Sequence, residues 1–287
     1  MKTQLIILLL LSANLCFGQY KAKKKPSGSN AVQSTQWWIG IKAGTNVTNP
    51  NPSGNFGTFS YTDTPSLGNG EKNYAQYNLP GYQFGFIVDF EFFKGLSARI
   101  QPAFSSFQYS YSVDFLWASQ ENANKNVALN YVHTNQLQYL DLPLTFKYQL
   151  ASGKTKPYIQ AGAYLSSLLN ATKKVEEEIT DNATGGNTIF DKNEYAGQIK
   201  DYYVKSNWGL VFGAGVTQNL GNARFGLEVN YRKGMKNISN SSSRYLDNQF
   251  LSGVFDAQDD IKLDVIEISL SVVMPLKFIT SKDYVPL

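Results

Sequence analysis

The feature that most constrains this chain is a strict alternation of apolar and polar residues, which is clearest in residues 137–171. From residue 140 to residue 148 every second side chain is apolar or aromatic, whereas Asp141 and Lys147 occupy the other face. The same period resumes after a short polar turn at residues 151–155. Because successive side chains of a strand point to opposite sides, this stretch predicts two strands joined by a tight turn, each with one apolar face.

Alternation of this kind recurs along the chain and predicts eight strands. They lie at residues 37–46, 82–92, 96–113, 137–149, 157–171, 207–216, 224–232 and 263–278. Several exceed the roughly 9 to 11 residues that a tilted strand needs to cross a bilayer. In the third strand the phase changes after Ser106, which predicts a β-bulge. The aromatic face would then continue on the same side through residues 107–113.

The connections between these strands alternate in length. Short ones follow the second, fourth and sixth strands, and long polar ones follow the others, at residues 47–79, 114–130, 172–201 and 233–262. A transmembrane barrel with short periplasmic turns and long outer loops has this asymmetry, and an even strand number places both termini in the periplasm. The sequence therefore predicts an all-β fold, a transmembrane antiparallel up-and-down β-barrel of eight strands. A ten-stranded barrel is the alternative if a long loop contains an extra hairpin.

Composition favours the same fold class. Only 17% of the residues are charged and the mean hydropathy is -0.28, so the apolar residues are spread thinly along the chain. Beyond the N-terminus, no stretch approaches the roughly 20 consecutive apolar residues of a spanning helix. The net charge of +4 is small and evenly scattered, which argues against a nucleic-acid partner.

The N-terminus predicts an exported protein. Lys2, an apolar run and small residues up to Gly18 have the layout of a signal peptide. We expect cleavage before Gln19. The predicted organisation is a signal peptide at residues 1–18, a polar, Lys-rich periplasmic leader at residues 19–35, the barrel at residues 36–278 and a short tail at residues 279–287. The location that follows is the bacterial outer membrane.

The faces opposite the apolar ones carry five cations and five anions. They are Lys42, Arg99, Lys147, Arg232, Lys277, Asp89, Glu91, Asp141, Glu228 and Glu267. The interior of an eight-stranded barrel is just wide enough for side chains, so these residues would meet there. Buried opposite charges are tolerable only when they are paired and hydrogen-bonded. We therefore predict a structural network that plugs the lumen.

Aromatic residues cluster near both ends of the predicted strands, as in the two girdles of membrane barrels. The turn-side set is Trp37, Trp38, Phe92, Phe93, Tyr148, Tyr158 and Phe278. The loop-side set is Tyr82, Tyr109, Tyr111, Tyr131, Tyr139, Tyr202, Trp208 and Tyr231. Carbohydrate binding by some of the loop-side residues is the alternative interpretation.

Parts of the chain resemble a known family. The hairpin LQYLDLPLTFKYQL and KPYIQAGAYLSSLLNA, followed by NWGLVFGAGVTQNLGNARFGLEVNYRKGMKNI, is similar to the PorT-like outer-membrane β-barrel proteins that are common in Bacteroidota. The resemblance covers about residues 37–278, and YLDLP and KPYIQAG are its most specific parts. It implies an outer-membrane location and a small barrel. The founding member of the family is associated with the type IX secretion and gliding apparatus, whereas most relatives have no assigned activity. Many outer-membrane barrels finish on an aromatic residue, whereas here residues 279–287 follow Phe278.

Catalytic side chains are scarce. His133 is the only histidine, and it is predicted near the outer start of the fourth strand, with Asp114, Ser119 and Glu121 in the preceding loop. No spacing among them defines a triad, so we interpret His133 as a rim or surface residue. The only cysteine, Cys16, lies in the predicted signal peptide, and no cluster of His and Cys suits zinc. The sequence predicts no catalytic residue, metal or cofactor.

The hypothesis that these observations favour is a non-enzymatic, monomeric barrel that acts through its loops or within an envelope or secretion assembly. Its expected partners are outer-membrane lipid and envelope or secretion-system proteins. Two alternatives stay open: a small pore or ligand-binding barrel, and an enzyme with its site at the rim.

Overall fold

The computed structural model describes residues 36–56, 72–93, 95–118, 122, 125–183, 188–190, 192–245 and 256–276. These residues belong to one compact unit, residues 35–287. The predicted signal peptide, leader and tail lie outside the described residues, as do Lys277 and Phe278. Within the described part of the chain, no helix is long and apolar enough to span a membrane.

The described residues form twelve strand segments and two short 3-10 turns. The strands are β1 (Gln36–Gly54), β2 (Lys72–Ala75), β3 (Pro80–Phe93), β4 (Leu96–Ile100), β5 (Ala103–Ala118), β6 (Asn126–Gln149), β7 (Thr155–Asp181), β8 (Thr188–Ile189), β9 (Asn193–Gln198), β10 (Ser206–Leu220), β11 (Ala223–Gly234) and β12 (Asp260–Pro275). The 3-10 turns are η1 (Lys200–Tyr202) and η2 (Ser241–Ser243).

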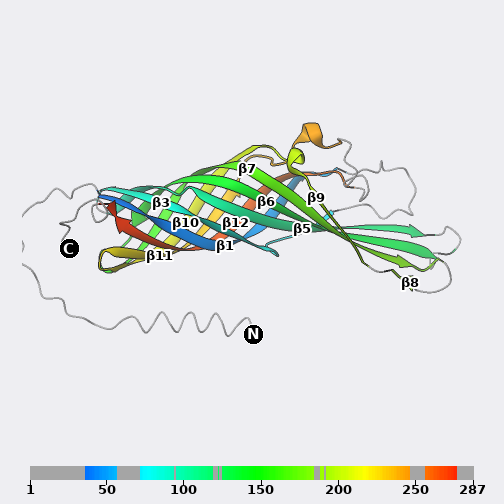
Figure 1. Cartoon of the computed structure of the whole chain (residues 1–287), viewed down its shortest axis with the longest axis horizontal. Coiled ribbons are helices and arrows are strands. Elements are labelled where there is room, and N and C mark those ends of the chain that lie inside the picture. The colour runs from blue at the N-terminus through cyan, green and yellow to red at the C-terminus, as the bar shows by residue number, and fades with distance from the viewer. Residues whose placement is uncertain are drawn as a thin grey trace, which may run out of the picture. The chain divides into compact units, whose positions relative to one another are not determined.

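The strands close into an antiparallel ring (Figure 1). The order around the ring is β1, β3, β4 with β5, β6, β7, β10, β11 and β12, and β1 closes it by pairing with β12 over Trp38 to Gly54. β2 pairs with β5 alone among the described strands. β4 and β5 occupy one position in the ring, because both pair with β3 and β6 and only Gln101 and Pro102 separate them. Proline has no N–H to donate to a ladder, which interrupts the strand there. Among the described residues the ring thus has eight strand positions, which confirms the predicted fold class.

The apolar faces of the ring point outward. Phe86, Phe146 and Leu165 are 66%, 57% and 64% exposed, and many other apolar side chains of the wall are similarly open. A soluble protein rarely exposes such a continuous apolar surface, whereas lipid covers it in a membrane. We call this surface the lipid-facing band. It extends from the side of the short turns, near Tyr148, to outward residues such as Leu140 on the side of the long connections.

Three strands continue beyond the lipid-facing band on the side of the long connections (Figure 1). β5 pairs with β6 as far as Ala118 and Asn126, and β6 pairs with β7 as far as Asp181. β8 and β9 pair with the outer part of β7. We call this sheet the outer extension.

The prediction of polar loops at residues 114–130 and 172–201 was therefore wrong over most of their length. The reason is that a ladder of backbone hydrogen bonds does not need an apolar face. Strands can leave the membrane without the pattern that marks a spanning strand.

The β-bulge predicted after Ser106 is also absent from the described pairing of β5 with β6. The odd-numbered residues of β5 stay on the inner side, so the face of Phe107 and Tyr109 points into the barrel and not toward lipid. What changes after Ser106 is the polarity of the inner face, not the phase of the strand. A register shift occurs instead between β6 and β7, where Gln138 and Tyr139 face Asn170 and Leu168.

Candidate functional site in the barrel interior

The charged layer of the interior is centred on Arg99 of β4. Its Nη1 lies 3.0 Å from Glu228 Oε2, and its Nη2 lies 2.9 Å from Asp89 Oδ2. Lys147 Nζ lies 3.4 Å from the same Asp89 oxygen, and Lys42 Nζ lies 3.9 Å from Glu228 Oε1. All five side chains are buried. Because they come from β1, β3, β4, β6 and β11, the cluster joins strands from around the whole ring.

A second charged cluster lies around Arg232 of β11. Arg232 Nη1 is 2.8 Å from both Asp141 Oδ2 and Glu267 Oε1, and Nη2 donates to Asp141 Oδ1 at 3.1 Å. The guanidinium therefore holds Asp141 in a two-bond arrangement, which is the strong geometry for an arginine and a carboxylate. Ser166 Oγ donates a further hydrogen bond to Asp141.

A separate ion pair joins Glu91 to Arg224, with Arg224 Nη1 3.2 Å from Glu91 Oε2. The Arg224 guanidinium carbon also lies 3.4 Å from the centre of the Trp38 ring. Arg224 was not among the predicted lumen residues, although it lies on the same face of β11 as Glu228 and Arg232 and could have been predicted from that alternation.

The predicted network residues are thus brought together, apart from Lys277, which lies outside the described residues. Each of the other nine has an opposite charge within ion-pair distance. Their role as a structural plug stays a prediction.

An apolar layer fills the interior on the side of the long connections. It consists of Phe107, Tyr109, Tyr111, Val113, Phe115, Tyr131, Leu137, Tyr139, Leu168, Ala171, Val175, Ile199, Tyr202, Tyr203, Ile238, Ile261, Leu263 and Val265. Some of its tyrosine hydroxyls form hydrogen bonds with one another; for example, those of Tyr109 and Tyr203 lie 2.7 Å apart. We call this the aromatic layer.

Burial of aromatic side chains in the interior corrects the predicted girdles. Several residues that were predicted to lie at the lipid interfaces are buried in the interior instead. They are Trp38, Tyr158, Tyr109, Tyr111, Tyr131, Tyr139 and Tyr202. Trp37, Phe93, Tyr148, Tyr82 and Trp208 are exposed at the two ends of the lipid-facing band, as predicted. Sequence position along a strand shows how near an aromatic residue is to an end, but the side that it faces depends on the packing of the interior.

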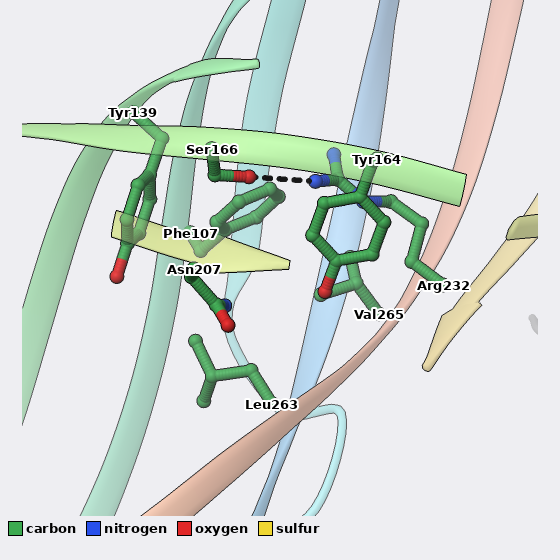
Figure 2. Close-up of a pocket in the computed structure, with 8 residues that line it drawn as sticks. All are labelled: Phe107, Tyr139, Tyr164, Ser166, Asn207, Arg232, Leu263 and Val265. Carbon is green, nitrogen blue, oxygen red and sulfur yellow. Dashed lines mark hydrogen bonds between the residues drawn. The ribbon is translucent and has the colours of Figure 1, made fainter. Parts of the chain in front are cut away.

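A small cavity lies between the charged and aromatic layers (Figure 2). Its volume is about 10 Å³, and Arg232, Ser166, Tyr139, Tyr164 and Phe107 are among its lining residues. Figure 2 shows the Arg232 guanidinium next to Ser166, which accepts its hydrogen bond at 3.3 Å. A space of this size holds about one water molecule, so it provides no passage between the two layers.

Residues 256–259 cover the aromatic layer at the barrel mouth, and we call them the mouth segment. All four are buried. Lys72 Nζ of β2 lies 3.2 Å from Asp256 Oδ1 and 3.1 Å from Asp259 Oδ1, and Lys173 of β7 also pairs with Asp256. No spacing in the sequence links these residues, because they come from three separate connections and strands. Folding alone brings them together.

His133 lies beneath the mouth segment, beyond the lipid-facing band. Its ring stacks on Tyr111 with centroids 4.6 Å apart, and neither ring nitrogen has a hydrogen-bond partner among the described residues. Burial and the nearby charge of Lys173 lower its pKa to about 3. The interpretation of His133 as a rim or surface residue was wrong, since it is 1% exposed. Asp114 is hydrogen-bonded to Asn130, and Ser119 and Glu121 lie outside the described residues.

Comparison of the sequence with models of known protein families identifies a match. The model of the outer membrane protein β-barrel domain matches residues 19–240. No curated protein matches the chain.

Several solved structures are similar to the chain at low sequence identity. For OprG from Pseudomonas aeruginosa the identity is 14%, the match covers 84% of this chain and 95% of that one, and the TM-score is 0.38. For neisserial surface protein A the identity is 10%, the match covers 84% of this chain and 99% of that one, and the TM-score is 0.32. For Ail, the attachment invasion locus protein of Yersinia pestis, the identity is 10%, the match covers 83% of this chain and 99% of that one, and the TM-score is 0.29. Because the family model matches most of a chain that closes into a lipid-facing ring, the protein belongs to the outer membrane protein β-barrel domain family and resides in the bacterial outer membrane.

Proposed function

We propose that this protein is a closed, non-enzymatic and monomeric barrel that acts through its outer extension and loops as a component of an envelope assembly. The observation that carries the proposal is the filling of the interior by two layers of side chains. A barrel with this interior anchors and presents its outer surface; it does not conduct or process a substrate through the lumen.

The charged layer supports a closed lumen because its groups neutralise one another. Arg99, Lys147 and Glu228 are buried and lie within ion-pair distance of opposite charges. A porin, in contrast, keeps its interior polar and filled with water. The aromatic layer and the mouth segment add two further barriers on the outer side.

The outer extension supports a role in binding other proteins. It carries exposed apolar side chains outside the lipid-facing band, including Leu116, Val132 and Tyr195. Aromatic side chains such as Tyr195 are enriched in the buried centre of protein interfaces, so these residues provide contacts for a protein partner.

The identity of the assembly rests on sequence resemblance. Similarity to PorT-like proteins of Bacteroidota supports a secretion apparatus of the type IX kind as the partner complex. The outer membrane itself supplies the lipid partner.

Site-specific photo-crosslinking in cells tests the proposal. A photoreactive residue in place of Leu116 or Tyr195 should capture an envelope protein, whereas the same residue in place of the lipid-facing Phe86 should not. Capture of no protein from either extension site, with full expression of both variants, would contradict a role of the extension in an assembly.

Planar-bilayer recording tests the closed lumen separately. The purified protein should show little steady conductance, because its eight-stranded interior is filled. Large and reproducible single-channel steps from the unmodified protein would reject the closed barrel in favour of a pore.

A further inference from the structure

Four lysines lie at the outer ends of β10, β11 and β12: Lys205, Lys233, Lys236 and Lys262. None of them lies within ion-pair distance of a carboxylate among the described residues. By comparison, Lys174 and Lys192 of the outer extension reach carboxylate oxygens at 3.0 Å. We call the four residues the lysine rim. Lys205, Lys233 and Lys262 are exposed and Lys236 is half-buried, so an anion from outside the chain can reach the cluster.

The lysine rim stands directly above the lipid-facing band. Lys233 follows Tyr231 on the outer face of β11 and faces Asp264 across the ladder to β12. Lys262 is the next outward residue of β12 beyond Asp264. Since the Asp264 carboxylate accepts hydrogen bonds from Tyr231 at 3.0 Å and Asn51 at 2.7 Å, it is engaged within the wall.

The other two lysines lie beside the outermost exposed tryptophan, Trp208. Lys236 Nζ donates to the backbone oxygen of Ser206 at 2.9 Å, and Lys205 precedes that serine. Tryptophan and tyrosine mark the level of the lipid headgroups in a membrane protein. A flexible lysine next to them reaches the headgroup phosphates with its ammonium group while its alkyl chain rests on apolar surface.

The opposite wall of the barrel differs at this level. The outward residues above the lipid-facing band on β5 and β6 include Gln108, Gln136 and Gln138, which carry no charge. Two of them bond within the wall, Gln108 to Pro80 O and Gln136 to Ser106 Oγ. The cationic surface of β10–β12 therefore has no counterpart at these positions of β5 and β6.

We propose that the lysine rim binds the phosphate groups of a phosphorylated glycolipid in the outer leaflet. Lysine is a common phosphate ligand that acts as a point charge, and clusters of basic residues next to a membrane recognise anionic headgroups. The apolar wall below the rim, with Tyr231 and Trp208 at its edge, binds the acyl chains of the same lipid. The proposal depends on the membrane location and not on any partner assembly.

Thermal stabilisation of the detergent-solubilised protein tests the site. Bisphosphorylated lipid A should raise the unfolding midpoint, measured by heat-modifiable migration on gels. Dephosphorylated lipid A with the same acyl chains should raise it less, and inorganic phosphate should not raise it. In the double variant Lys233→Gln and Lys262→Gln, the lipid concentration for half the effect should increase about tenfold or more.

The matched control is the double variant Lys174→Gln and Lys192→Gln, which removes the same charge from the outer extension. It should respond to lipid A as the unmodified protein does. Equal responses of both double variants, or equal effects of phosphorylated and dephosphorylated lipid, would overturn the site. An equal effect of inorganic phosphate would assign the lysines to a free anion and would overturn the lipid as ligand.

Discussion

Glu228 illustrates at the scale of one residue how the charged layer is stabilised. Its carboxylate is fully buried, pairs with Arg99 and accepts hydrogen bonds from Tyr158 at 2.9 Å and Asn230 at 3.2 Å. Burial of a charged carboxylate is tolerated only while these partners remain, because no solvent is in contact with it to replace them.

The substitution Glu228→Gln should therefore lower the stability of the barrel strongly. It leaves the buried Arg99 with one carboxylate partner fewer, and breaking such a pair costs about 3 to 5 kcal/mol when the pair is fully desolvated. Heat-modifiable migration on gels should show a lower unfolding temperature. The substitution Lys174→Gln is the control, because exposed ion pairs contribute about 0 to 1 kcal/mol. Equal midpoints in the two variants would contradict a stabilising network.

At the scale of an element, the mouth segment depends on ion pairs from β2 and β7. Lys72 and Lys173 hold its carboxylates, and its side chains are closed to solvent. The segment belongs to a long connection, so its position relies on these contacts more than on the strand ladder.

Cysteine labelling measures whether these lysines hold the segment in place. In intact cells a maleimide should react slowly with Ala257→Cys, which is 1% exposed, and rapidly once Lys72→Met and Lys173→Met are added. Tyr245→Cys is 69% exposed and should react rapidly in both backgrounds. Cys16 is the only native cysteine, and with Cys16→Ser in every background each variant reports on one designed position. Rapid labelling of Ala257→Cys without the lysine substitutions would show that the segment does not close the mouth.

At the scale of the whole molecule, the alternation of short and long connections predicts the orientation in the membrane. The short turns include Gly95 and Gly221, whose φ angles of 84° and 60° lie in the left-handed region that glycine adopts without strain. Tight turns of this kind are typical of the periplasmic side of a bacterial barrel.

Protease added to intact cells should therefore cut the connections between β1 and β3, between β7 and β10 or between β11 and β12. It should spare the turns at Gly95 and at residues 150–154. Cells with a permeabilised outer membrane provide the control, since both sides are then accessible. Cleavage confined to the short turns of intact cells would invert the orientation.

The sequence by itself determined the strand period, the eight positions of the ring and the outward direction of the apolar faces within the membrane. These follow from local alternation, because lipid imposes one rule on every spanning strand. The same alternation places charged residues such as Arg99 and Glu228 on the interior face, although it does not show which residues they contact.

Only the tertiary structure decided which side the aromatic residues beyond the membrane face. At Ser106 a change of polarity without a change of phase gives the same sequence pattern as a β-bulge, and the pairing of β5 with β6 excludes the bulge. The burial of His133 and the ion pairs of residues 256–259 were equally out of reach. Such contacts join segments that are distant in sequence, so their energy depends on packing and not on any local period.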